Sequence, residues 1–245
     1  MDIFKRSVIF LIAIGQIHIH GLNLPSYNRK FIHIDVYYET RCPDSQRFLL
    51  NQIIQANEIF SSNIDFLLVP FGKANYTWDD DSKKWNFHCQ HGPQECYGNT
   101  IHNCLIDQKP KFEDHFPFLA CTMENLMESF ETAALYCAKK HSIDYEGLKK
   151  CANDVKGNRL LHEAGEKTNK LDPKLNYIPW INVNGVHTNE IQQLAERNLT
   201  YFICSQLKDS HVYCSRNDSN SYLNFQKSIF LNFCIFALYF ILSFS

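Results

Sequence analysis

The chain has 245 residues, of which 45% are hydrophobic, so it is long enough to bury the core of one elaborated domain. Lys and Arg total 24 against 26 Asp and Glu, which gives a net charge of −2 at pH 7. No run of Lys and Arg interrupts this balance, and we therefore exclude a nucleic acid as partner.

The first predicted element is a leader over residues 1–21. Two basic residues precede an apolar run from Val8 to about Ile17, and small residues near Gly15 and Gly21 suit a signal peptidase. An N-terminal membrane anchor is the alternative, but the run is shorter than the roughly 20 residues of a membrane span. The pattern favours a signal peptide and entry into the secretory pathway.

Strand and helix signals alternate after the leader. In FIHIDVYYE, residues 31–39, apolar side chains recur at every second position, which predicts a strand. From Pro43 to Phe60 they recur at helical spacing, and a proline suits the first turn of a helix because its missing N–H costs nothing there. The apolar run of residues 64–72 predicts a second strand, parallel to the first and covered on both faces. These elements form one right-handed crossover unit.

The rest of the chain completes a recognisable order of elements. Residues 73 to about 170 predict a mostly helical insertion that holds most of the cysteines. Strand signals return in YIPWINVNGVHT, where Asn184 and Gly185 predict a two-residue hairpin turn, and a last amphipathic helix follows from about Asn189 to Leu207. This order predicts an α/β, thioredoxin-like fold with a disulfide-rich helical insertion, in one domain over residues 22–214.

One cysteine stands apart, at the junction of the first strand and helix. Cys42, in YYETRCPDSQRF, lies where unpaired N–H groups and the positive end of the helix dipole favour a thiolate, the nucleophile of disulfide exchange. Arg41 adds a positive charge, which Asp44 opposes. An inert buried thiol is the alternative, and the position at the start of a helix disfavours it. We therefore predict that Cys42 is catalytic.

The position three residues later lacks the usual second sulfur. In a CxxC site that sulfur resolves the mixed disulfide, and here Ser45 occupies its place. A serine hydroxyl is able to donate a hydrogen bond to the Cys42 thiolate. The pattern therefore predicts capture of a substrate disulfide, with release by an external thiol or by the second cysteine of the substrate.

The remaining cysteines form an even set once Cys234, in the apolar tail, is left aside. Eight of them pair as four disulfides in an oxidising compartment and leave Cys42 unpaired. All 105 connectivities remain open, although Cys204 and Cys214 are close enough for a local loop. A further alternative pairs Cys42 with one of the eight. The set comprises Cys89, Cys96, Cys104, Cys121, Cys137, Cys151, Cys204 and Cys214.

Two further signals concern the secretory pathway and the membrane. Residues 215–228 form a polar spacer before the hydrophobic tail of residues 229–245, an arrangement that signals replacement of the tail by a glycolipid anchor. A short transmembrane helix is the alternative, but its apolar part spans only about 24 Å against a bilayer core of about 30 Å. Three Asn-x-Thr or Asn-x-Ser sequons predict glycosylation at Asn75, Asn198 and Asn217.

The segment HCQHGPQECYGNTIHNC, residues 88–104, resembles the signature of the γ-interferon-inducible lysosomal thiol reductase (GILT) family. Together with the CxxS site and the IPWINVNG segment, the resemblance spans residues 31–214. It implies a thioredoxin-like, secreted or endolysosomal glycoprotein that reduces or exchanges protein disulfides, at acidic pH in family members. Well-studied members carry a second catalytic cysteine where this chain has Ser45, so the departure bears directly on turnover.

The resemblance also bears on individual residues. It implies that Pro179, after Ile178, begins the third core strand beside the active sulfur and offers backbone groups to an extended substrate; an ordinary trans proline is the alternative. Gln90, His91 and Glu95 receive no catalytic role. The signature also offers a set of zinc ligands, but an even cysteine set in an oxidising compartment is more simply a disulfide framework, and we predict no metal and no cofactor. The zinc set would be Cys89, His91, Cys96 and Cys104.

Two hypotheses follow. The first is a thiol-disulfide oxidoreductase with Cys42 as nucleophile, whose partners are disulfide-containing proteins and an external thiol that acts as resolving reductant. The second is a catalytically silent relative that keeps the fold and binds protein partners. In either case we expect an extracellular, cell-surface or endolysosomal protein.

Overall fold

The computed structural model describes residues 31–125, 129–208 and 211–215. The predicted leader, the hydrophobic tail, nearly all of the spacer and the sequon at Asn217 lie outside these residues. Within the described residues we find no helix that is both long enough and apolar enough to cross a membrane.

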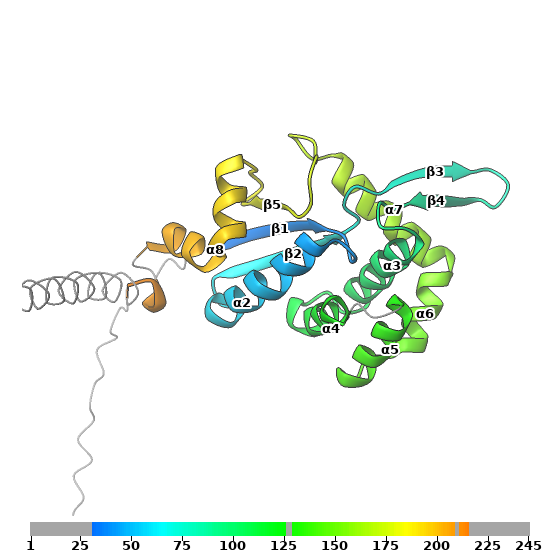
Figure 1. Ribbon diagram of the computed structural model, residues 1–245, viewed down its shortest axis with the longest axis horizontal. Helices are drawn as coiled ribbons and strands as arrows, with labels where there is room; N and C mark the ends of the chain where they lie inside the picture. The colour runs from blue at the N-terminus through cyan, green and yellow to red at the C-terminus, as the bar shows by residue number, and fades with distance from the viewer. Residues whose placement is uncertain (1–30, 126–128, 209–210, 216–245) are drawn as a thin grey trace, which may run out of the picture.

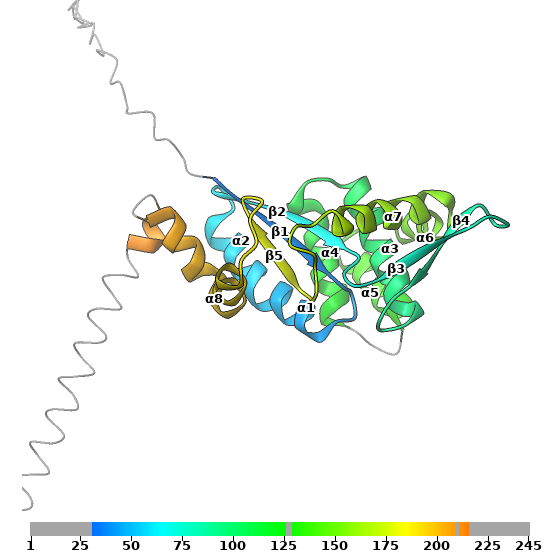
Figure 2. The ribbon, with the colours of Figure 1, turned by 90° about the horizontal axis from the view of Figure 1, so that it is seen from above.

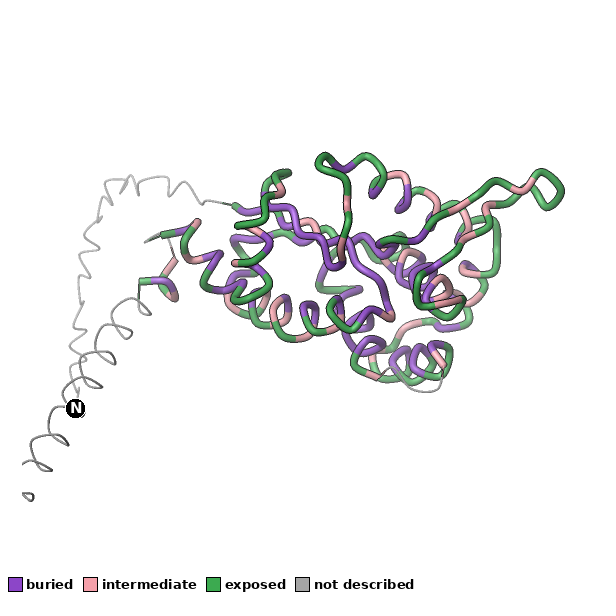
Figure 3. The backbone as a smooth tube through the Cα atoms, turned by 45° about the horizontal axis from the view of Figure 1, so that its top comes forward, coloured by how far each residue is buried: buried purple, intermediate pink, exposed green. Residues whose placement is uncertain are grey.

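The core is a three-stranded sheet with β1 in the middle (Figure 1). β1 (Ile32–Tyr38) pairs in parallel with β2 (Ile64–Pro70) on one side and antiparallel with β5 (Trp180–Val183) on the other. The alternate side chains of β1 are fully buried, as their spacing predicts. The second strand is parallel as expected but not covered on both faces, because Leu67 is 41% exposed. In Figure 3 the tube is mostly purple where the central strands run.

A single helical rod leads from β1 to β2, as the sequence predicts, but its middle is wound differently. α1 (Pro43–Phe48) and α2 (Ile54–Phe60) are α-helical, and the turn between them, η1 (Leu49–Ile53), is π-helical. A π turn holds an extra residue and rotates the helix surface, so that residues on both sides of it face the core. Phe48, Leu49, Ile53, Ala56 and Phe60 are all buried.

The predicted helical insertion is helical from residue 93 onward, and Figure 1 shows its helices gathered at one end of the sheet. The expectation is wrong at its start, where an antiparallel hairpin stands instead. Aromatic residues alternate along both hairpin strands and pack on one another, with the Tyr76 and Trp85 rings 5.2 Å apart. The elements are β3 (Asn75–Asp79), β4 (Lys84–His88), α3 (Pro93–Gln108), α4 (Phe112–Glu124), α5 (Phe130–Lys140), α6 (Tyr145–Asn153) and α7 (Val155–Asn169).

The C-terminal part follows the prediction closely. Asn184 and Gly185 both have positive φ, 51° and 77°, and Val183 and Val186 exchange backbone hydrogen bonds across them, as a two-residue turn requires. α8 (Asn189–Leu207) then packs against β5 and against η1 of the first helical rod. One break was not predicted: Asn198 leaves the helical conformation (φ −161°, ψ 91°), and its side chain accepts a hydrogen bond from a backbone N–H three residues on.

Four disulfides join the eight cysteines of the predicted set and select one of the 105 pairings. Two of them hold the insertion together, since one links α3 to α6 across 47 residues and another links α4 to α5. A third closes the loop before α3, and the fourth ties the end of α8 to the last described residues. The pairs are Cys89–Cys96, Cys104–Cys151, Cys121–Cys137 and Cys204–Cys214.

Candidate active site

Cys42 is the N-cap of the first helix and the one free cysteine among the described residues. Its backbone is extended (φ −74°, ψ 121°), and its carbonyl accepts the first helical hydrogen bond, from the N–H of Gln46 at 3.0 Å. Its own N–H donates to the Glu39 carbonyl at 3.3 Å, which closes a tight turn after β1. The residue is buried, with 7% of its surface exposed, so the thiol lies at the helix start beneath the surface.

Ser45 is fully buried and does not make the predicted bond to the thiol. Its Oγ accepts a hydrogen bond from the Glu39 N–H at 3.3 Å, and the structure contains no hydrogen bond between Ser45 and the Cys42 sulfur. The hydroxyl therefore ties the first turn of the helix to the residue that follows β1. The backbone at Glu39 thus contacts both residues of the CxxS site.

Pro179 lies at the same end of the sheet as Cys42. The register pairs Tyr37 with Trp180, which sets Pro179 beside Tyr38, the last residue of β1. The Ile178–Pro179 peptide bond is cis, and the Pro179 carbonyl accepts a hydrogen bond from Gln192 Nε2 of α8 at 2.8 Å. Ile178 is 9% exposed. Figure 2 shows β1 and β5 running beside each other toward the start of α1.

The signature segment contacts the turn that carries the thiol. The Thr40 N–H donates to Asn99 Oδ1 at 3.0 Å, and the Thr40 hydroxyl donates to the Glu95 carbonyl at 3.2 Å. Sequence reasoning assigned Glu95 and Asn99 no role in the site. Both residues belong to the signature motif, and its fixed spacing is the one sequence signal that marks them. That spacing does not indicate that they contact the turn before Cys42.

A buried acid cluster, formed by Glu39, His91 and Glu95, lies against this turn. His91 Nδ1 is 2.5 Å from Glu95 Oε2 and 3.3 Å from Glu39 Oε2, while Glu39 Oε1 accepts the Lys73 N–H at 2.7 Å. Burial above all, with help from the Glu95 charge, raises the pKa of Glu39 to about 7 against the opposing effects of Lys73 and His91. A Cβ at Gly72 (φ +64°) would overlap the Glu39 side chain, so only glycine leaves room for this carboxyl.

The alternative zinc set of the signature is not available in this structure. Cys89, Cys96 and Cys104 are all disulfide-bonded, so they present no thiolate to a metal. Within the described residues, one other group has ligand atoms close enough for a cation, within 4.8 Å of one another: the acid cluster itself. Within this cluster His91 Nδ1 and Glu95 Oε2 form a direct hydrogen bond.

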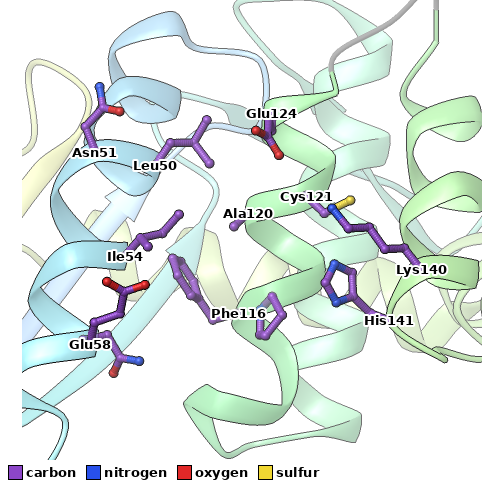
Figure 4. A pocket seen from close by; sticks show the side chains of 12 residues that line it. Leu50, Asn51, Ile54, Glu58, Phe116, Ala120, Cys121, Glu124, Lys140 and His141 are labelled. Atoms are coloured by element: carbon purple, nitrogen blue, oxygen red, sulfur yellow. The ribbon is translucent and has the colours of Figure 1, made fainter.

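Two of the grooves that border the first helical rod (α1, η1 and α2) are relevant to the site. One, of about 490 Å³, lies between this helix and α4; Figure 4 shows Leu50 and Ile54 facing Phe116 and Ala120 across it. No residue of the turn from Glu39 to Cys42, which we call the active turn, lines this groove. The other, of about 290 Å³, is lined by Asp44 and residues of the first helix on one side and by Glu196 and Arg197 of α8 on the other. Because Asp44 is two residues from the thiol, this second groove adjoins the active turn.

A thiol at the N-terminus of the first helix, on a parallel βαβ unit with a proline-led antiparallel strand beside it, defines the class: a thioredoxin-fold thiol-disulfide oxidoreductase. Solved structures agree on the fold. Oxidised BdbD from Bacillus subtilis superposes with a TM-score of 0.51 at 13% identity, over 68% of this chain and 86% of that one. DsbA from Chlamydia trachomatis gives 0.50 at 14% identity, over 69% and 87%.

Sequence comparison identifies the family. The model for "Gamma interferon inducible lysosomal thiol reductase (GILT)" matches residues 33–141. The protein of that name from Carassius auratus is 34% identical over 184 residues, which cover 74% of this chain and 71% of the relative. A GILT-like protein from Anopheles gambiae is 31% identical over 201 residues, 77% and 82% of the two chains. The chain belongs to the GILT family and is an oxidoreductase that acts on sulfur groups, which confirms the predicted fold and enzyme class.

Glycosylation of the two sequons within the described residues remains a prediction. Asn75 lies at the start of β3 and Asn198 at the break in α8, and both are exposed. The Asn198 carboxamide oxygen accepts a hydrogen bond from the Thr200 hydroxyl at 2.8 Å.

Proposed function

We propose that this enzyme exchanges protein disulfides through a single sulfur. The Cys42 thiolate attacks one sulfur of a substrate disulfide; a bond from Cys42 to that sulfur forms, the substrate S–S bond breaks, and the departing substrate thiolate takes up a proton. The observation that carries the proposal is the unpaired thiol of Cys42 at a helix N-cap, in a chain whose other described cysteines are all bridged.

The second half of the reaction needs a thiol from outside. Ser45 has no sulfur, and the eight other described cysteines are committed to disulfides. A thiolate of a small reductant, or the second cysteine of the substrate, therefore attacks the substrate sulfur or the Cys42 sulfur of the mixed disulfide. Attack by an external thiol on the Cys42 sulfur releases the substrate with both its thiols reduced and leaves the reductant bound to Cys42, from which a second external thiol removes it as a disulfide. Attack on the substrate sulfur instead frees Cys42 and leaves the reductant on the substrate, where a second external thiol completes the reduction. When another cysteine of the substrate attacks the substrate sulfur, Cys42 is freed and the substrate disulfide is re-formed or isomerised. No cofactor takes part in any of these routes.

The substrate is a protein segment in extended conformation. The backbone of Ile178 makes no hydrogen bond to any described residue, so its polar groups remain for a strand laid beside Pro179. The groove between Asp44 and Glu196 lies along the first helix and begins two residues from Cys42 in the chain. We propose the substrate path along these two features.

The protein works in the secretory pathway, in the endolysosomal system or at the cell surface. The four disulfides and the predicted leader and glycosylation sites support an oxidising compartment. The relatives from Carassius auratus and Mus musculus are named lysosomal thiol reductases, which supports the endolysosomal assignment. The predicted glycolipid or membrane attachment through the tail remains part of the proposal.

Trapping of mixed disulfides tests the function. Wild-type protein is mixed at pH 5 and pH 7 with a denatured, disulfide-containing protein, quenched with acid and alkylating agent, and run without reductant. We expect a covalent adduct that Cys42→Ala abolishes and that external thiol dissolves. Ser45→Cys adds a resolving sulfur and should shorten the adduct's lifetime. If wild type traps nothing at either pH, the proposal fails and the silent, partner-binding alternative gains.

A further inference from the structure

The acid cluster has no part in the exchange chemistry just described, but it is joined directly to the active turn. Glu39 belongs to the turn, and the Glu95 carbonyl accepts a hydrogen bond from Thr40. Glu39 and Glu95 have fully buried side chains, whereas that of His91 is 31% exposed. The Glu39 Oε2 atom is buried with no hydrogen-bond partner, although it faces the His91 ring. A buried carboxylate oxygen without a donor is costly, so the cluster is incompletely neutralised when both acids are ionised.

The backbone of Glu39 connects this cluster to the turn that carries the thiol. The Glu39 carbonyl accepts the Cys42 N–H, and the Glu39 N–H donates to Ser45 Oγ. The next residue, Thr40, is held by two hydrogen bonds to α3, one of them to the Glu95 carbonyl. Any displacement of the Glu39 side chain therefore moves both ends of the turn that positions Cys42.

We propose that His91 and Glu95 are positioning residues for Cys42: acting through Glu39 and Thr40, they hold the active turn, and they hold it firmly only while Glu39 keeps its proton. The proposal rests on the proposed role of Cys42 as nucleophile. It adds that the cluster holds the active turn in place only over a limited pH range.

The charges that face Glu39 explain this dependence. They come from His91 in the loop before α3, Glu95 on α3 and Lys73 after β2. With Glu39 protonated, its carboxyl adds no charge to the buried cluster. When Glu39 loses its proton, two carboxylates share one imidazole in a site of low dielectric, and they repel each other. The pKa of about 7 that burial gives Glu39 puts this change near neutral pH.

The rate at which iodoacetamide alkylates Cys42 tests the proposal without any protein substrate, so it stays informative even if turnover fails. The rate is measured from pH 5 to pH 8 on the peptide that carries Cys42, in wild type and in Glu39→Gln, whose neutral amide imitates the protonated acid. We expect equal rates near pH 5. At pH 8 the variant should react about fivefold faster, the lower range of coupling between protein sites, with the change centred near pH 7.

Two variants should move that midpoint in opposite directions. Glu95→Gln removes the charge that raises the Glu39 pKa and should shift the midpoint down, whereas His91→Gln removes the charge that lowers it and should shift it up. Glu163→Gln, an exposed acid on α7 paired with Arg159, is the matched control and should follow wild type.

Four results would overturn the proposal. A variant-to-wild-type ratio that does not change with pH would make Glu39 merely structural, and midpoints unmoved by both cluster variants would remove His91 and Glu95 from the device. A wild-type profile changed by EDTA would assign the cluster to a cation instead of a proton. Because a variant could also misfold, the chemical shifts of the Glu39 carboxyl carbon and of the Cys42 amide are followed by NMR against pH in wild type. The two titration curves should share one midpoint. Separate midpoints would refute the coupling.

Discussion

His102 joins the end of the central strand to the helical insertion, and its titration makes stability depend on pH. The Tyr38 hydroxyl lies 2.8 Å from its Nδ1, and its Nε2 lies 2.8 Å from Thr122 Oγ1. Thr122 donates to the Leu119 carbonyl, so Nε2–H donates to Thr122 and Nδ1 accepts from Tyr38, which describes a neutral ring. Burial, with a smaller effect of His115, lowers the pKa of His102 to about 3.

The sign and size of the effect follow from linkage. Below pH 6.5 the unfolded chain protonates this histidine, but the folded protein does not until about pH 3, so stability is lost as the pH falls through this window. At about 1.4 kcal/mol per pH unit below pH 6.5, acidification from pH 7 to pH 4.5 costs roughly 2–3 kcal/mol at this residue. His102→Gln keeps an acceptor for Tyr38 and a donor for Thr122 but does not titrate.

Urea unfolding of both proteins at several pH values, with the disulfides intact, measures the difference. At pH 7 the variant should be less stable by about 1–2 kcal/mol, since the smaller amide packs less well. Between about pH 5 and pH 6 the two stability curves should cross, and at pH 4.5 the variant should be the more stable protein. The other titratable groups are the same in both proteins, so their contributions to the pH dependence of stability cancel in the difference. Parallel curves over the whole range would refute the assignment of a neutral, buried His102.

Three further predictions concern other parts of the fold. Glu39→Gln should remove a loss of about 3 kcal/mol that wild type suffers as the pH rises from 4.5 through 7, because its folded pKa is raised; urea unfolding at pH 5 and pH 8 checks this. Gly72→Ala should destabilise by about 3 kcal/mol or more and slow Cys42 alkylation, while Gly185→Ala, with positive φ but open space, should cost only about 1–2 kcal/mol by thermal unfolding. Replacing Cys104 and Cys151 together by Ala should cost about 4 kcal/mol, the loop entropy of a bridge across 47 residues; an unchanged midpoint in urea would contradict it.

The parts of the fold that local chemistry determines could be predicted from the sequence. Alternation identified β1, the Asn184 and Gly185 pair identified the hairpin turn, and the cap position of Cys42 followed from a strand signal that meets a proline-led helix. The β3–β4 hairpin escapes prediction because its alternating aromatic residues are interleaved with Asp, Lys and Asn, and stretches rich in Lys and Asp indicate loops between the helices of the insertion.

Features that depend on contacts between distant residues could not be predicted in this way. The acid cluster joins Glu39 to His91 and Glu95 across more than fifty positions, and no periodicity connects them. The disulfide pairing could not be predicted for the same reason. Spacing suggests only the Cys204–Cys214 bridge, because these two cysteines are close in the chain and lie apart from the others. Ser45 illustrates a third limit: its residue type excluded a resolving role, but its actual partner is a backbone N–H.

The most direct test of the account is whether the folded protein uses Cys42 to break a disulfide. Native protein is treated with 4,4′-dithiodipyridine, the released thiopyridone is recorded, and the modified cysteine is located by mass spectrometry without reduction. We expect a mixed disulfide between Cys42 and the thiopyridyl group, with the four bridges intact. Recovery of Cys42 in a bridge with one of the other eight cysteines, or its modification only after denaturation, would contradict it.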